Sequence, residues 1–285
     1  HELTAYARLI SDTDTDIDAG HCSSGGSGGG GDGGVGTVRH EILLPLPPTK
    51  PGNRSTGTSA SAGDDGVSVS DGGADSSDGC NGLWRVHVLH GLVPPEACAA
   101  LVKHAEAWAA APGGGWRVDR HREHRTTDID IAESSAALME TCNDLLRRTL
   151  LPRMARLFGL PPGDLTVEDL FLAKYGAAPG MQSSLAGHRD GSELSFVVAL
   201  NDRVGGGYSG GGTEFLDRMP GKGRLVAAPA VGGVVMFCGK HRHAGVATTA
   251  GTRYILAGFV RVHATGVEGC TLLGEVQRVF GAGTG

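Results

Sequence analysis

The second half of the chain contains short hydrophobic runs that are typical of β-strands. After Leu165 these runs are rich in β-branched and aromatic residues, and clusters of glycine separate them. The pattern predicts strands over 170–173, 194–200, 225–226, 234–237 and 254–262. Strands so close together, with no helical period between them, favour a small barrel or jelly roll over a doubly wound nucleotide-binding fold.

Helical patterns precede these strands. Residues 84–89 alternate as a strand does, and an amphipathic helix is predicted from 95 to 111, ending before the glycines at 113–115. A second helix fits 134–149, and a shorter helical piece follows from Pro152. The sequence therefore predicts an α+β domain with a mainly β core and flanking helices on its N-terminal side.

Composition separates the first 82 residues from the rest. Residues 1–82 hold 18 of the 48 glycines but one of the 14 aromatic residues, so they bury too little apolar surface to offset the entropy of ordering. We predict a disordered Gly/Ser/Asp-rich tail over 1–82, apart from a short apolar stretch at 38–46. A folded domain is predicted over 83–265 and a C-terminal extension over 266–285.

Charge follows the same division. Residues 1–82 carry 12 acidic and four basic residues, whereas the rest of the chain has a net charge of +2. A nearly neutral domain disfavours nucleic acid as a partner, and no apolar run approaches the ~20 residues of a membrane span. The six cysteines show no Cys-x-x-Cys spacing, so the disulfide state and compartment stay open, as does the oligomeric state.

A His-x-Asp triplet carries the first chemical signal. In an extended chain, residues i and i+2 point to the same side, so His188 and Asp190 would present an imidazole and a carboxylate to one point. Either His241 or His243, which follow the predicted strand 234–237, could add a second imidazole. Two histidines and one carboxylate leave three metal positions open, as in non-haem Fe(II) oxygenases.

Arg253 carries the second signal. It stands ten residues after His243, at the start of the predicted strand 254–262. A guanidinium buried in a barrel needs a planar anionic partner, and a carboxylate that accepts two hydrogen bonds is the natural match. In an oxygenase this partner is the distal carboxylate of 2-oxoglutarate. A surface arginine is the alternative.

Residues 84–262 resemble the catalytic domain of the prolyl/lysyl hydroxylase group of Fe(II)/2-oxoglutarate-dependent dioxygenases, including the catalytic domain of the prolyl 4-hydroxylase α-subunit. The motifs that carry the resemblance occur in the same order in both. They are Arg-Thr-Thr-Asp-Ile at 125–129, Leu-Ala-Lys-Tyr at 172–175, His-Arg-Asp at 188–190, Gly-Gly-Gly-Thr-Glu-Phe at 210–215, His-Arg-His-Ala-Gly at 241–245 and Gly-Thr-Arg-Tyr at 251–254.

This resemblance implies a double-stranded β-helix, or jelly roll, with flanking helices. It also implies that His188, Asp190 and His243 bind Fe(II), with His243 favoured over His241 because it precedes the Ala-Gly step as the ligand does in the family. Arg253 and Tyr175 would hold 2-oxoglutarate. Molecular oxygen would be the second co-substrate, and ascorbate (vitamin C) an accessory reductant.

The implied function is hydroxylation of a C–H bond in a peptide or protein substrate, on proline ahead of lysine, with succinate and CO2 as co-products. The resemblance also implies the secretory pathway, including the endoplasmic reticulum, as the location. Lysyl hydroxylases tend to have an asparagine where this chain has Val197, and that asparagine helps to hold the co-substrate. Loops around 112–127 and 201–212 are candidate lids.

Other functions compete with this one. Within the same enzyme class, the substrate could be a free amino acid or another small molecule. A non-catalytic jelly-roll binding module could keep the metal site only as a scaffold. A zinc hydrolase on the same ligands would need a nearby general base and gives no reason for Arg253 or Tyr175.

Overall fold

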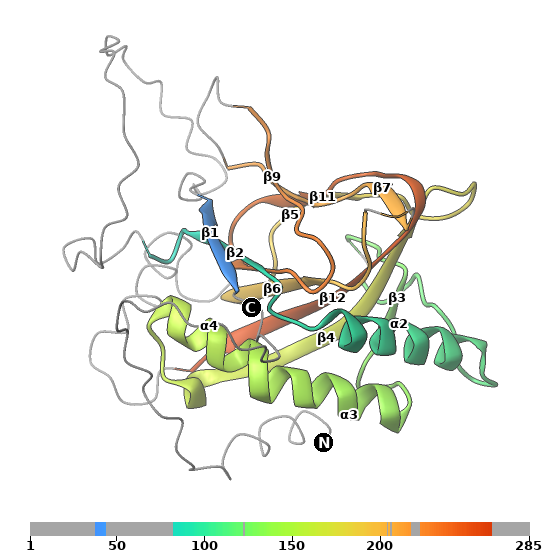
Figure 1. Ribbon diagram of the computed structural model, residues 1–285, viewed down its shortest axis with the longest axis horizontal. Helices are drawn as coiled ribbons and strands as arrows, with labels where there is room; N and C mark the ends of the chain where they lie inside the picture. The colour runs from blue at the N-terminus through green and yellow to red at the C-terminus, as the bar shows by residue number, and fades with distance from the viewer. Residues whose placement is uncertain are drawn as a thin grey trace, which may run out of the picture.

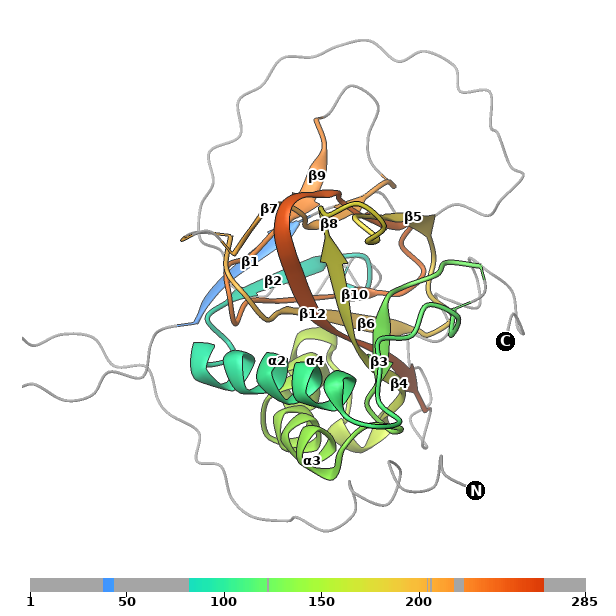
Figure 2. The same cartoon turned by 90° about the vertical axis from the view of Figure 1, so that its right-hand side faces the viewer.

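Two β-sheets face each other, and helices cover the outer face of the larger sheet (Figure 1 and Figure 2). The computed structural model describes residues 38–43 and 82–263, except 122, 204, 206 and 218–222. The helices are α2 (Pro95–Ala110), α3 (Ala136–Leu145) and α4 (Leu151–Phe158), with a π-helical turn at Leu146–Leu150 and a 3-10 turn at Pro162–Asp164.

Neighbouring strands of the larger sheet all pair antiparallel. The strand order is β1-β2-β10-β6-β12-β4-β3, and β7 also pairs with β12. Its strands are β1 (Arg39–Leu43), β2 (Val86–His90), β3 (Asp128–Asp130), β4 (Leu165–Gly176), β6 (Leu194–Ala199), β7 (Tyr208–Gly210), β10 (Val234–Cys238) and β12 (Thr248–Val262). The smaller sheet has the order β5-β11-β8-β9. Its strands are β5 (Leu185–His188), β8 (Thr213–Phe215), β9 (Leu225–Ala227) and β11 (His243–Gly245).

Strand β12 shows why the sheet has two different faces. Leu256 and Val260 pack in the main hydrophobic core together with residues of α2, α3 and α4. Ile255 and Ala257, one position out of phase, line a pocket between the two sheets. Because side chains alternate along a strand, the same sequence supplies the helix-packed core on one face and a cavity wall on the other.

The predicted fold is confirmed: the core is mainly β, with two facing sheets and flanking helices. Each predicted strand overlaps an observed one. The second predicted helix runs on through the π-helical turn into α4. The amide of Leu151 donates to the carbonyl of Leu146, five residues earlier, so the wider π-helical turn lies directly before Pro152. Strands β3, β5, β7, β8 and β11, each at most four residues long, were not predicted.

Part of the predicted tail is ordered: residues 39–43 form β1 and pair with β2, inside the apolar stretch 38–46. Residues 1–37 and 44–81 of the predicted tail and the predicted extension 266–285 lie outside the described residues. Among the cysteines that the structure describes, Cys98, Cys142 and Cys238 are buried free thiols. None of the described helices is both long and apolar enough to cross a membrane.

A buried histidine holds β1 against the domain. His87 on β2 is 3% exposed; its Nδ1 lies 3.0 Å from Nε2 of His40 on β1, and the edge of its ring meets Phe158. Burial, together with the nearby His40 and Arg85, lowers the pKa of His87 to about 4. The imidazole is therefore neutral in the folded chain at neutral pH.

This depressed pKa predicts acid destabilisation. In the unfolded chain His87 titrates near its ordinary value of 6.5, so its contribution to stability is complete above that pH and is lost as the pH falls towards 4. We expect the free energy of unfolding to lose about 2–3 kcal/mol from this group between pH 7 and pH 4. Urea denaturation at several pH values measures the slope. His87→Gln should show a smaller slope, and equal slopes would contradict the assignment.

Candidate metal centre and its pocket

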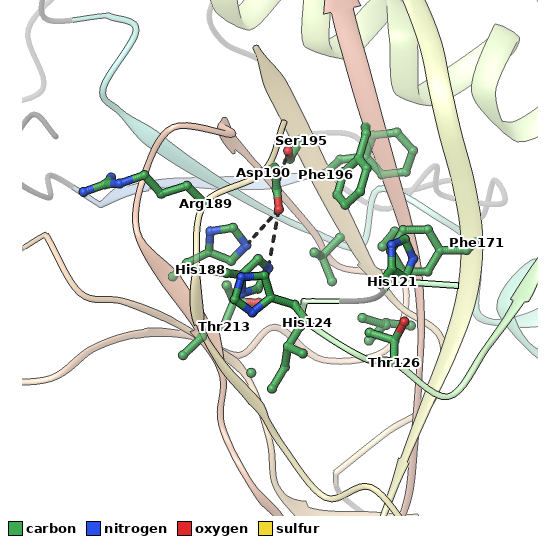
Figure 3. Close-up of a pocket in the computed structure, with 18 of the residues that line it drawn as sticks. His121, His124, Thr126, Phe171, His188, Arg189, Asp190, Ser195, Phe196 and Thr213 are labelled. Carbon is green, nitrogen blue, oxygen red and sulfur yellow. Dashed lines mark hydrogen bonds and ion pairs between the residues drawn. The ribbon is translucent and has the colours of Figure 1, made fainter. Parts of the chain in front are cut away.

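Three potential metal ligands converge between the two sheets. His188 ends β5, Asp190 follows two residues later, and His243 begins β11, directly opposite His188 in the antiparallel register. One ligand atom from each residue lies within 4.8 Å of the other two. Oδ1 of Asp190 is 3.4 Å from Nε2 of His188 and 3.6 Å from Nε2 of His243 (Figure 3).

Main-chain carbonyls fix the orientation of both imidazoles. Nδ1 of His188 is 2.8 Å from the carbonyl oxygen of Ala186, and Nδ1 of His243 is 2.9 Å from that of His241. A carbonyl oxygen can only accept, so each Nδ1 carries a proton, and in the neutral form of each ring Nε2 has the free lone pair. Burial by itself would lower the pKa of His188, but Asp190 and the Ala186 carbonyl outweigh it and raise the pKa. Both lone pairs are thus available on the side of Asp190, as metal ligation requires.

The carboxylate is also held. The hydroxyl of Ser195 donates to Oδ2 of Asp190 over 2.6 Å, which leaves Oδ1 for the imidazoles. Burial by itself would raise the pKa of Asp190, but His243, His188 and the Ser195 hydroxyl outweigh it and lower the pKa. Asp190 is therefore ionised at neutral pH. Two imidazoles and one carboxylate are a donor set that fits Fe(II).

Ser195 gives a testable contribution to this site. Removing its hydroxyl in Ser195→Ala frees one carboxylate oxygen, and we expect the affinity for a divalent metal to fall by about 10-fold, as for other outer-shell partners. Titration calorimetry with Mn(II) measures the change without turnover. Thr141→Ala, which removes an exposed hydroxyl on α3, is the matched control. Unchanged Mn(II) affinity in Ser195→Ala would contradict this role.

The turn after β10 fastens the main chain around Asp190. Nζ of Lys240 donates to the carbonyl of Gly191 over 2.6 Å and to that of Asp190 over 3.2 Å, and the amide of Asp190 donates to the carbonyl of Gly239. A Cβ at Gly239 would lie 2.6 Å from the carbonyl oxygen of Ser192, so only glycine allows this approach. No local sequence pattern points to Lys240 or Gly239, since these contacts join segments about 50 residues apart.

The structure distinguishes the two candidates for the second histidine ligand, His241 and His243. His241 is fully buried outside the cluster, and its Nε2 lies 3.0 Å from the carbonyl oxygen of Trp84. The structure thus brings His243, not His241, beside Asp190. The side chain of Arg189 points away from His188 and Asp190 (Figure 3), and its Nη1 lies 2.9 Å from Oδ2 of Asp217. As predicted from alternation, the side chains of His188 and Asp190 point to the same side, and that of Arg189 points to the other.

The cluster lines a cavity of about 330 Å³ between the sheets. Arg253 and Tyr175 also line this cavity; both are buried, and the Arg253 guanidinium carbon is 5.7 Å from the centre of the Tyr175 ring. Nε of Arg253 has no hydrogen-bond partner among the described residues. A buried guanidinium with an unused donor fits a carboxylate ligand. Gly211, at φ +69°, makes room for it, because a Cβ there would lie 2.8 Å from Cδ of Arg253.

Other lining residues were only partly anticipated. Val197 does line the cavity, as does the hydroxyl-bearing Thr213, which the sequence did not single out. Of the two candidate lids, 112–127 supplies lining residues. None of the described residues of 201–212 lines the cavity.

Comparison with known proteins gives one consistent sequence relationship. The chain is 31% identical over 176 residues to human procollagen-lysine,2-oxoglutarate 5-dioxygenase 1. It is 32% identical over 181 residues to the rat multifunctional procollagen lysine hydroxylase and glycosyltransferase LH3. These matches cover 58% and 59% of this chain but 22% of each relative, so the chain spans about a fifth of the length of these relatives. No protein-family profile matches the chain.

Solved structures show more distant similarity. The viral collagen prolyl hydroxylase from Paramecium bursaria chlorella virus-1 has a TM-score of 0.43 and 18% identity, covering 70% of this chain and 98% of that one. A non-haem α-ketoglutarate-dependent carbocyclase from nogalamycin biosynthesis has a TM-score of 0.49 and 15% identity, covering 63% of this chain and 79% of that one. With its jelly-roll core, its His-Asp-His cluster and this sequence relationship, the chain is similar to the prolyl/lysyl hydroxylase group of Fe(II)/2-oxoglutarate-dependent dioxygenases.

Proposed function

We propose that the chain is an Fe(II)- and 2-oxoglutarate-dependent dioxygenase that hydroxylates a C–H bond on a lysine or proline residue of a peptide. The observation that carries the proposal is one cavity lined by both the His188, Asp190 and His243 cluster and the buried Arg253. The procollagen lysine hydroxylases among its relatives support a peptide substrate.

Each residue has a physical task in this reaction. His188, Asp190 and His243 hold Fe(II) through two neutral nitrogens and one anionic oxygen. When bound, the iron couples O2 and 2-oxoglutarate to the substrate, so that one oxygen atom enters the C–H bond and the other enters succinate as CO2 leaves. Arg253 binds the distal carboxylate of 2-oxoglutarate, and Tyr175 lies beside that guanidinium. The buried cavity walls exclude water from the reacting groups.

Further parts of the proposal concern the whole protein. We propose that 83–265 is the dioxygenase domain, flanked by a tail at 1–82 and an extension at 266–285. Ascorbate would keep the iron reduced between turnovers. The named relatives act on procollagen lysine, which supports a location in the secretory pathway for this chain.

Succinate release tests the proposal. The purified chain is supplied with Fe(II), 2-oxoglutarate and ascorbate, with and without collagen-like peptides that contain proline, lysine or both. We expect iron-dependent succinate that rises with peptide, and a peptide product 16 Da heavier. Turnover that no peptide changes would point to a small-molecule substrate. No succinate from a folded, metal-loaded chain would leave the non-catalytic binding module as the better explanation.

A further inference from the structure

Three aromatic rings form a cluster on the cavity wall, well away from Arg253. The rings of Phe171 and Phe259 have centroids 5.5 Å apart, and the His121 ring lies 4.9 Å from that of Phe171 and 6.3 Å from that of Phe259. All three side chains line the cavity, and Figure 3 shows His121 against Phe171. Phe259 stands six residues beyond Arg253 on β12, about 20 Å along the strand.

His121 belongs to a segment that is closed at its base. The backbones of Arg117 and Asp128 exchange two hydrogen bonds of 2.8 and 2.9 Å, which close the base of the segment between them. Loop 118–127 here means the described residues of this segment, all but 122. Besides His121, this loop brings His124 to the cavity, with its ring centroid 4.9 Å from that of His188. The loop therefore extends from the aromatic rings to the candidate metal ligands.

Arg120 anchors the loop to the larger sheet. Its guanidinium contacts the carboxylates of Asp128 at 2.9 Å, Asp130 at 3.0 Å and Asp169 at 2.8 Å. The Arg120 side chain is 12% exposed and that of Asp128 is fully buried, so water screens these ion pairs less than it would at the surface.

A second anchor holds the end of the loop. The side-chain amide of Gln182 donates to the carbonyl of Arg125 over 2.7 Å, and the amide of Lys174 on β4 donates to the carbonyl of Thr127 over 2.9 Å. With ion pairs in the middle and hydrogen bonds at both ends, loop 118–127 is a fixed wall of the cavity. The expectation of a lid over 112–127 does not describe this anchored part.

We propose that loop 118–127, together with Phe171 and Phe259, forms the wall of the cavity against which the aliphatic side chain of the substrate packs. Arg120 is the residue that positions this wall. This inference rests on the proposed function. Ring faces bind aliphatic C–H groups by apolar contact and tolerate a nearby positive charge. A wall that is already ordered requires little further ordering when the substrate binds.

Variants of the rings test the wall directly. The probe is a collagen-like peptide that contains both proline and lysine. Phe171→Leu and Phe259→Leu keep most of the apolar volume but remove the ring. We expect the KM for the peptide to rise by about 3- to 10-fold, and by more than the KM for 2-oxoglutarate. Fluorescence anisotropy of the labelled peptide with metal-free protein should show a similar loss of affinity.

A variant of Arg120 tests the positioning role. Arg120→Gln should raise the KM for the peptide and lower the ratio of hydroxylated peptide to succinate, and Arg120→Lys should restore part of both. The matched control is Arg261→Gln, which breaks the exposed Arg261–Glu168 pair outside the cavity. Thermal denaturation separates these effects from a loss of folding.

The outcomes distinguish this inference from the proposed function. A chain that releases no succinate overturns the proposed function. A chain that releases succinate but does not bind the peptide overturns both the peptide substrate and the wall. A chain that hydroxylates the peptide, but whose Phe171, Phe259 and Arg120 variants bind it as the wild type does, overturns the wall alone. Equal changes in the KM for peptide and for 2-oxoglutarate would also overturn it, since they would indicate a general structural effect.

Discussion

Replacing Asp190 by alanine is expected to abolish succinate release, with turnover lowered by about 1000-fold or more. The substitution removes the one anionic donor of the cluster and leaves two neutral imidazoles, His188 and His243, facing a divalent cation. A 1000-fold loss corresponds to an increase of about 4 kcal/mol in the activation free energy. This increase is small for an enzyme that has lost its metal.

The measurement pairs turnover with metal binding. Succinate is quantified at saturating Fe(II) and 2-oxoglutarate, and Mn(II) affinity is measured separately. Asp144→Ala is the control, because it removes an exposed carboxylate on α3 that pairs with Arg148. Circular dichroism checks that both variants fold. If Asp190→Ala kept wild-type turnover, neither the metal site nor the oxygenase mechanism could stand.

Sequence patterns predicted those parts of the fold that repeat over several residues. Strand β12 and helix α2 are long enough for their alternation or helical period to be read. The strand β11, by contrast, has three residues, His243 to Gly245, and exists because β5 and β8 pair with it on either side. Such a strand depends on its neighbours in space, which a sequence window does not contain.

The same division applies to the site. The triplet at 188–190 presents two side chains to one side because of local geometry alone, so it could be predicted. The choice between His241 and His243 came from resemblance. The contacts of Lys240 with Gly191 and of Arg120 with Asp169 join distant segments, and no pattern in one sequence identifies them.

The second large effect concerns Arg253, where we expect a loss of activity without a loss of stability. Arg253 is 6% exposed, its Nε has no partner among the described residues, and burial lowers its pKa. Replacing a poorly compensated buried charge by an apolar side chain is often neutral or stabilising. We therefore expect Arg253→Met to leave the melting temperature of the ligand-free chain equal to or above that of the wild type.

Binding of 2-oxoglutarate should suffer strongly in the same variant. A charge-assisted hydrogen bond to a carboxylate contributes about 1.5–3 kcal/mol, so the KM for 2-oxoglutarate should rise by about 10- to 100-fold. Thermal denaturation with added 2-oxoglutarate and Mn(II) gives an independent readout. We expect 2-oxoglutarate to raise the melting temperature of the wild type, and to raise that of Arg253→Met much less. Arg224→Met, which breaks the exposed pair with Glu214, is the control. If the ligand stabilised Arg253→Met as much as the wild type, the carboxylate would have to bind elsewhere in the cavity.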